Sequence, residues 1–173
     1  MLRGREVALR QFQGEEVEDY VRFLNDPRRC LGQDFSFVSP NQFQAEFVRT
    51  SFLTADSAVL AIDLPDEKHV GVASWYVANS SLGNLELRVD FYRAELDTVE
   101  RRRDAYRVLC TYLFETKPVA RLQVLLRHED EAGLAAATSL GFRYEGILKS
   151  LYFHDGAWRD LRVLSVLRDE LHD

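Results

Sequence analysis

Apolar and polar residues recur with regular periods along most of the chain, and these periods predict its secondary structure. Alternation in residues 86–93 predicts a strand with one apolar and one polar face. A continuous apolar run in residues 58–62 is typical of a strand buried on both faces. A long amphipathic helix is predicted next, with an apolar stripe of Ala105, Val108, Leu109, Tyr112 and Leu113.

The other elements follow from similar patterns. Strands are predicted at residues 7–11, 70–77, 119–127, 144–154 and 157–167, and helices at residues 14–25, 129–140 and from Pro40 onward. Ser39 and Gln42 predict a capping box at the start of the helix that begins at Pro40. Residues 28–38 show no clear period and are expected to form a loop.

The last two strands carry the clearest turn signal. Asp155 and Gly156 predict a two-residue hairpin loop. This register places Phe153 opposite Trp158 and Tyr152 opposite Arg159.

Composition and charge then narrow the class of protein. The 173 residues, 46% of them hydrophobic, suit one domain (residues 1–173) whose sheet is covered by helices on both faces. A net charge of -6 argues against nucleic-acid binding, and no apolar run approaches the roughly 20 residues of a membrane span. We therefore expect a soluble cytoplasmic protein without nucleic-acid or membrane partners. Cys30 and Cys110 lack metal-site spacing and are expected to be two reduced thiols, with no metal site.

Several motifs resemble the GNAT acyltransferase superfamily, in particular its branch of ribosomal-protein-alanine and amino-acid acetyltransferases. They are VALR at 7–10, FLNDP at 23–27, GNLEL at 83–87 and GFRYEGILKSLYFHDGAWRDLRVLSVLRDE at 141–170. The resemblance covers almost the whole chain. It implies an α+β fold, a three-layer α/β sandwich whose mixed, mostly antiparallel sheet has helices on both faces.

The resemblance also implies a cofactor, a substrate and a reaction. Acetyl-CoA or another acyl-CoA is expected between the splayed strands that begin at Glu86 and Val119, and an amine of a small molecule or peptide N-terminus would attack its thioester. Glu86 would act through water as general base, and a tyrosine on the following helix would protonate the leaving thiolate. The cofactor-binding residues would be Val89, Phe91, Arg101, Arg102 and Arg103.

The sequence departs from the family at the pyrophosphate loop. The glycine-rich loop of the family falls on LDTVERR at 96–102, where Asp97, Thr98, Val99 and Glu100 replace the glycines. Glycine lets backbone N–H groups close on phosphate. Asp97 and Glu100 instead predict a capping box that would occupy those N–H groups with carboxylates.

Two readings remain open for the arginine run 101–103: phosphate binding, or an exposed charged turn. Beyond it, the Asn and Ser of the family fall on Asp130 and Gly133, and its tyrosine falls on Ala137. Alanine cannot donate a proton, although active relatives also lack the tyrosine.

Polar residues on the strand at 86–93 are the remaining candidates for chemistry. Glu86 is expected to be either the base or an ion-pair partner of Arg88, and Asp90 is expected to be structural. His128, at a strand end, would face a ligand or be merely solvated. Trp75 and Tyr152 would be core aromatics or would line a substrate cleft with Arg88, Asp90 and His128. His154 and His172 are expected to play no chemical role, and Trp158 is expected to be a core or sheet-face aromatic.

Three functions are compatible with these observations. The first is a CoA-dependent N-acyltransferase with an unusual cofactor loop. The second is a GNAT fold that does not use acetyl-CoA and instead catalyses another reaction, or binds a ligand or partner, in the same cleft. The third is a noncatalytic partner protein, for example a homodimer formed through the hairpin or an edge strand.

Overall fold

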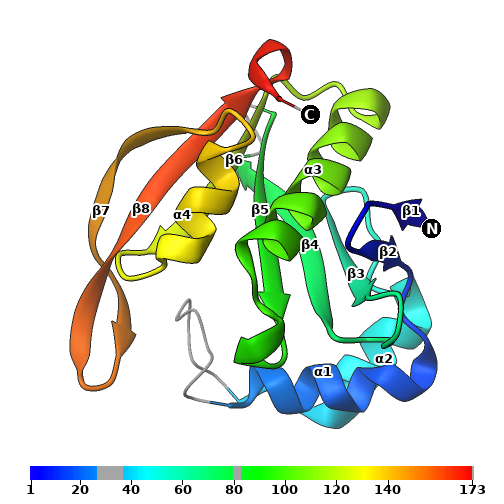
Figure 1. The fold of residues 1–173 in the computed structure, drawn as a ribbon. Helices are drawn as coiled ribbons and strands as arrows, with labels where there is room; N and C mark the ends of the chain where they lie inside the picture. Colours follow the sequence, from blue (N-terminus) through cyan, green and yellow to red (C-terminus); the bar gives the residue numbers. More distant parts are fainter. Residues whose placement is uncertain (27–36, 80–82, 173) are drawn as a thin grey trace.

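An eight-stranded sheet organises the computed structural model, which describes residues 1–26, 37–79 and 83–172. Its strand order is β1-β2-β3-β4-β5-β6-β8-β7 (Figure 1). Neighbouring strands are antiparallel except β5 and β6, which are parallel. The strands are Leu2–Arg3 (β1), Ala8–Arg10 (β2), Ser57–Asp63 (β3), Gly71–Asn79 (β4), Asn84–Phe91 (β5), Arg121–Arg127 (β6), Arg143–His154 (β7) and Ala157–Leu167 (β8). The predicted mixed, mostly antiparallel sheet is confirmed.

Helices form a layer on each face of this sheet (Figure 1). The helices are Val17–Leu24 (α1), Pro40–Thr50 (α2), Val99–Thr116 (α3) and Glu131–Thr138 (α4), with short 3-10 turns at Gly14–Glu16 (η1), Ala94–Leu96 (η2) and Arg168–Glu170 (η3). Helices α1 and α2 pack through an aromatic cluster that includes Phe12, Tyr20 and Phe52. Helices α3 and α4 cover the other face.

The two-residue period of β5 decides which side chains meet each helical layer. Leu85, Leu87, Val89 and Phe91 are buried in the core shared with α3 and α4. Glu86, Arg88 and Asp90 therefore face the α1 and α2 layer. Tyr92, on the same face, packs against Phe23 of α1 with ring centroids 5.1 Å apart.

Three local predictions have different outcomes. The hairpin register is confirmed, with Phe153 opposite Trp158 and Tyr152 opposite Arg159. The capping box at Ser39 is wrong, because helix α2 begins at Pro40 without a side-chain cap. The predicted loop 28–38 lies mostly outside the described residues, as does Cys30.

Cys110 is buried and free. None of the described helices is long and apolar enough to cross a membrane.

A buried ionic cluster joins the start of the chain to the sheet. Arg10 donates to Glu16 at 2.5 and 2.9 Å and to Asp63 at 2.9 and 3.0 Å. Burial alone would raise the pKa of both carboxyl groups, but the hydrogen bonds from Arg10 and from backbone N–H groups outweigh it and lower both pKa values.

This cluster predicts a loss of stability in acid. In the folded chain, the pKa values of Glu16 and Asp63 lie below their ordinary values of 4.5 and 3.8. The stabilisation from these two carboxylates is therefore complete above the ordinary pKa values, and it is lost as pH falls through the lower pKa values of the folded state. In thermal unfolding between pH 7 and pH 2, Arg10→Gln should lower Tm at pH 7 and flatten the acid limb. Arg22→Gln, at an exposed pair, is the control. Equal acid slopes for the native chain and Arg10→Gln would contradict this origin.

Candidate active site

The parallel strands β5 and β6 separate after a short stretch of pairing. They pair from Asn84 with Arg121 to Leu87 with Val124, whereas β6 stays paired with β8 as far as Arg127. A cavity of about 250 Å³ lies where the pairing ends. It is lined by Phe23, Leu87, Arg88, Val89, Asp90, Phe91, Ala94, Asp97, Arg102, Tyr106, Leu125, Leu126, Arg127 and Asp130. The predicted splay between the two strands is therefore present, and Val89 and Phe91 line it.

The cavity has two chemically different sides. The side toward α3 and α4 carries Tyr106 and an ionic cluster of Asp97, Arg102 and Asp130. The side toward α1 carries Phe23, Arg88, Asp90 and Arg127. A ligand that passed between the strands would therefore meet both sides of the sheet.

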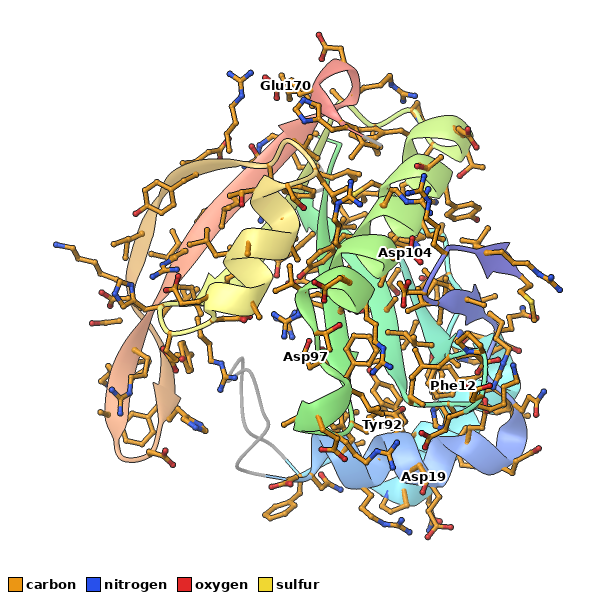
Figure 2. The ribbon with its side chains drawn as sticks, in the orientation of Figure 1. Phe12, Asp19, Tyr92, Asp97, Asp104 and Glu170 are labelled. Atoms are coloured by element: carbon orange, nitrogen blue, oxygen red, sulfur yellow. The ribbon has the colours of Figure 1, made fainter. Side chains whose placement is uncertain are left out.

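An ion triad centred on Arg102 occupies the start of α3. Arg102 Nε donates to Asp97 Oδ1 at 2.8 Å, a second bond joins Nη2 to Asp97 Oδ2, and Nη1 donates to Asp130 Oδ2 at 2.5 Å. Arg102 is only 7% exposed. Figure 2 shows Asp97 beside the first turn of α3. The triad joins the starts of α3 and α4.

The predicted capping box of Asp97 and Glu100 is wrong. Helix α3 is capped by Thr98, whose Oγ1 accepts the Arg101 N–H at 3.3 Å. A two-bond contact with a guanidinium is stronger than a cap to one N–H, so Asp97 turns to Arg102 instead. The Val99 and Glu100 N–H groups, which have no partner inside the helix, are not capped by a carboxylate of any described residue.

The arginine run does not act as one unit. Arg102 alone lines the cavity, and the reading of 101–103 as an exposed turn is wrong for this buried residue. Arg101 is half-buried and donates from Nη1 to the Leu96 carbonyl at 3.2 Å. Arg103 is also half-buried and does not line the cavity.

The start of α4 is shaped around the same triad. Asp130 Oδ1 accepts the Gly133 N–H at 2.9 Å and so caps α4 while Oδ2 binds Arg102. A Cβ at residue 133 would overlap Arg102 Nη1, so a larger residue there would have to displace the guanidinium of the triad. Ala137, at the family tyrosine position, is fully buried.

Glu86 is held by protein groups beside the cavity rather than in its lining. Its Oε1 accepts from the Tyr76 hydroxyl and lies 3.8 Å from Arg88, and its Oε2 accepts from Gln123 Nε2 at 3.0 Å. Burial is the main cause that raises the pKa of Tyr76 to about 12, and the hydrogen bond to Glu86 adds to it, so Tyr76 remains a donor. The ion pair of Glu86 with Arg88 is thus present, and both carboxylate oxygens are occupied.

Asp90 is the carboxyl group on the α1 side of the cavity. It makes no side-chain hydrogen bond with any described residue. Burial raises the pKa of Asp90, while Arg88 and Arg102 partly oppose the rise. A cavity-lining carboxyl with a raised pKa is suited to accepting a proton.

Three residues expected in a substrate cleft lie outside the cavity. His128 is exposed in the turn after β6. Trp75 is buried in the α3 core, beneath Lys117 at 4.2 Å from the ring centroid. Tyr152 is buried in β7, and its hydroxyl has no partner among the described residues. The structure brings together Arg88 and Asp90 of the predicted cleft set, but not these three.

Two polar residues of the cavity lining, Arg127 and Tyr106, were not singled out by the sequence analysis. Arg127 lies on the same face of β6 as Gln123 and Leu125, and the alternation of side chains along the strand could have indicated this from the sequence. Tyr106 lies one helical turn after Arg102, on the same side of α3, so helical spacing was its signal.

The residues present fit the acyl-pantetheine arm of an acyl-CoA better than its diphosphate. The unpaired edges of β5 and β6 offer backbone groups to an extended acyl-pantetheine arm. At the diphosphate end, the open N–H groups of Val99 and Glu100 fit an anion, but the Arg102 triad carries one net negative charge. No group of metal-binding side chains occurs within residues 1–26, 37–79 and 83–172.

Comparison with solved structures identifies the fold as that of GNAT acetyltransferases. The spermidine N-acetyltransferase of Vibrio cholerae, in complex with CoA and spermine, superposes with a TM-score of 0.81 at 13% identity, covering 95% of this chain and 97% of that chain. A GNAT-family acetyltransferase from Bacillus anthracis gives 0.77 at 14% identity, covering 98% and 99%.

The microcin C7 self-immunity acetyltransferase MccE, in complex with acetyl-CoA and AMP, gives a TM-score of 0.74 at 14% identity, covering 94% of this chain and 93% of that chain. No protein-family model matches the sequence, and no curated protein matches it. The similar solved structures show that this chain has the GNAT fold.

The predicted homodimer stays a prediction. Large exposed apolar side chains lie on the β7–β8 hairpin, the surface that such a contact would use: Tyr144, Ile147, Leu148, Leu151, Phe153 and Trp158.

Proposed function

We propose that this chain is an N-acyltransferase that moves an acyl group from an acyl-CoA thioester to the amine of a small molecule or peptide N-terminus. The observation that carries the proposal is the cavity at the separation of β5 and β6. Similar structures with bound CoA or acetyl-CoA support this choice of donor.

The two strand edges would hold the donor. Beyond Leu87 and Val124 the strands β5 and β6 no longer pair with each other, so backbone groups on their facing edges are available to an extended arm. Val89 and Phe91 supply apolar surface next to these edges. A bound thioester supplies an activated carbonyl carbon, and the chain supplies position and proton transfer.

Asp90 is the general base in this proposal, and Glu86 is a positioning residue. Asp90 lines the cavity and accepts no hydrogen bond from a described residue, whereas Glu86 is engaged by Tyr76, Gln123 and Arg88. Asp90 would accept a proton from the attacking amine. Because residue 137 is a buried alanine, solvent is left to return a proton to the sulfur.

A blocked cavity tests the proposal. Ala94 is exposed and lines the cavity, so Ala94→Trp should fill its mouth without disturbing the core. With acetyl-CoA and an amine panel, we expect amine-dependent thiol release by the native chain and by Ala135→Trp, an exposed control on α4, but not by Ala94→Trp. Thiol release that does not depend on the amine, or that survives in Ala94→Trp, would contradict the proposal.

One observation favours a second candidate, a ligand other than acyl-CoA in the same cavity. Asp97 and Asp130 share one guanidinium where a diphosphate would otherwise meet unpaired cations. A chain that releases no thiol from any acyl-CoA, yet binds a ligand that Ala94→Trp excludes, would have this second function.

A further inference from the structure

Arg127, on the α1 side of the cavity, is a cation without a partner among residues 1–26, 37–79 and 83–172. No residue that the structure describes accepts a hydrogen bond from its guanidinium or forms an ion pair with it, and its Nε is buried. The other arginines of the cavity differ from it, because Arg88 lies 3.8 Å from Glu86 and Arg102 binds two aspartates. A buried guanidinium nitrogen without an acceptor is costly unless a ligand supplies one.

The position of Arg127 places it on the acceptor side. Leu122, Val124 and Leu126 of β6 are buried in the α3 core, so Gln123, Leu125 and Arg127 face the opposite side. Gln123 on that face reaches Glu86. Arg127 and Asp90 therefore line the same side of the cavity, from the two separated strands.

The charged side chains on the α1 side of the cavity indicate which charges the acceptor carries. Asp90 can receive an ammonium group, and Arg127 presents a planar fork that matches a carboxylate. A polyamine would place only positive charge beside Arg88 and Arg127. Apolar surface between the charged groups comes from Phe23 and Leu125.

We propose that Arg127 binds the carboxylate of the acceptor, so that the substrate class is an amine that also carries a carboxylate, such as a free amino acid. This inference rests on the proposed function for the amine and extends it to a second binding group. In this proposal, Arg127 makes the enzyme prefer acceptors with a carboxylate over the corresponding amides and over polyamines.

Matched acceptor pairs test the proposal. With acetyl-CoA, a panel of L-amino acids is compared with the corresponding amino-acid amides, spermidine and O-phosphoethanolamine. We expect preference for at least one acid over its amide, and Arg127→Gln should raise KM for that acid by about 10- to 100-fold while leaving KM for the amide unchanged. Arg127→Lys should fall between the two, because it keeps the charge and loses the fork.

The control is Arg159→Gln, which removes an exposed positive charge on β8 outside the cavity lining and should leave the preference intact. Equal use of acids and amides, an unchanged preference in Arg127→Gln, or preference for spermidine or the phosphate-bearing amine would overturn the proposal.

A binding measurement separates this inference from the proposed function. N-acetyl-L-amino acids and their amides are titrated onto the native chain and Arg127→Gln by ligand-observed NMR. Binding of an acid that Arg127→Gln loses would support the carboxylate site even if no acyl transfer occurs. Acyl transfer together with equal binding of acids and amides would overturn the carboxylate site and leave the transferase intact. Thermal unfolding of Arg127→Gln should give a Tm equal to or above that of the native chain, because the side chain makes no hydrogen bond or ion pair with a described residue and its buried Nε has no acceptor there.

Discussion

Asp90→Asn is expected to lower the rate of acyl transfer by about 100-fold or more, with the fold intact. Asparagine has nearly the shape of aspartate but cannot accept the amine proton. Because burial raises the pKa of Asp90, the charged form is unfavourable in the folded state. Asparagine should therefore leave Tm at pH 7 unchanged or raise it. Initial rates and thermal unfolding of the same preparation measure both effects.

The pH profile distinguishes a base from a merely structural residue. Only ionised Asp90 can accept a proton, so activity should fall as pH decreases through its raised pKa, above the ordinary value of 3.8. Asp90→Asn should lose this acid limb. Glu86→Gln, the comparison variant, should retain the limb even if its rate falls through lost contacts with Tyr76 and Gln123. Loss of the limb in Glu86→Gln and its retention in Asp90→Asn would assign the base to Glu86 instead.

Arg102→Met should destabilise the fold by about 3 kcal/mol, because it leaves Asp97 and Asp130 without their shared cation. For a chain of this length, that change lowers Tm by roughly 6 to 12 °C. Chemical denaturation at pH 7 gives the free energy of unfolding directly. Arg22→Met, at an exposed ion pair on α1, should have little effect.

A charge-matched variant separates lost pairing from lost packing. Asp97→Asn, Arg102→Met and Asp130→Asn together remove all three charges, and asparagine at residue 130 can still cap α4. This triple variant should recover most of the stability that Arg102→Met alone loses. If it remains as unstable as the single variant, the methylene contacts of Arg102 rather than its charge hold the two helices together.

Much of the fold could be predicted from the sequence because it depends on short-range patterns. Alternation along β5 correctly separates the core residue Leu87 from Glu86 and Arg88. The Asp155-Gly156 turn fixes the hairpin register because its dihedral preferences are local, and both residues have positive φ. The two-residue strand Leu2–Arg3 was not predicted, since it is too short to show a period.

The site was less predictable because its partners come from distant segments. Local spacing predicted that Asp97 would cap α3, but Asp97 pairs with Arg102 instead. Arg102 is also held by Asp130, which is remote in the sequence. The predicted end of β6 at Arg127 is confirmed, but the residue after it, His128, was chosen for the cleft, whereas Arg127 lines the cavity and His128 is exposed in the turn. Successive side chains of a strand point to opposite faces, so choosing the neighbouring residue missed the cavity.

Isothermal titration calorimetry with acetyl-CoA and desulfo-CoA decides whether the cavity between β5 and β6 binds an acyl donor. We predict saturable binding of both ligands in the micromolar range to the native chain and to Ala135→Trp, and none to Ala94→Trp. Absence of heat and of any thermal shift at millimolar concentrations of either ligand would contradict an acyl-CoA site in this cavity.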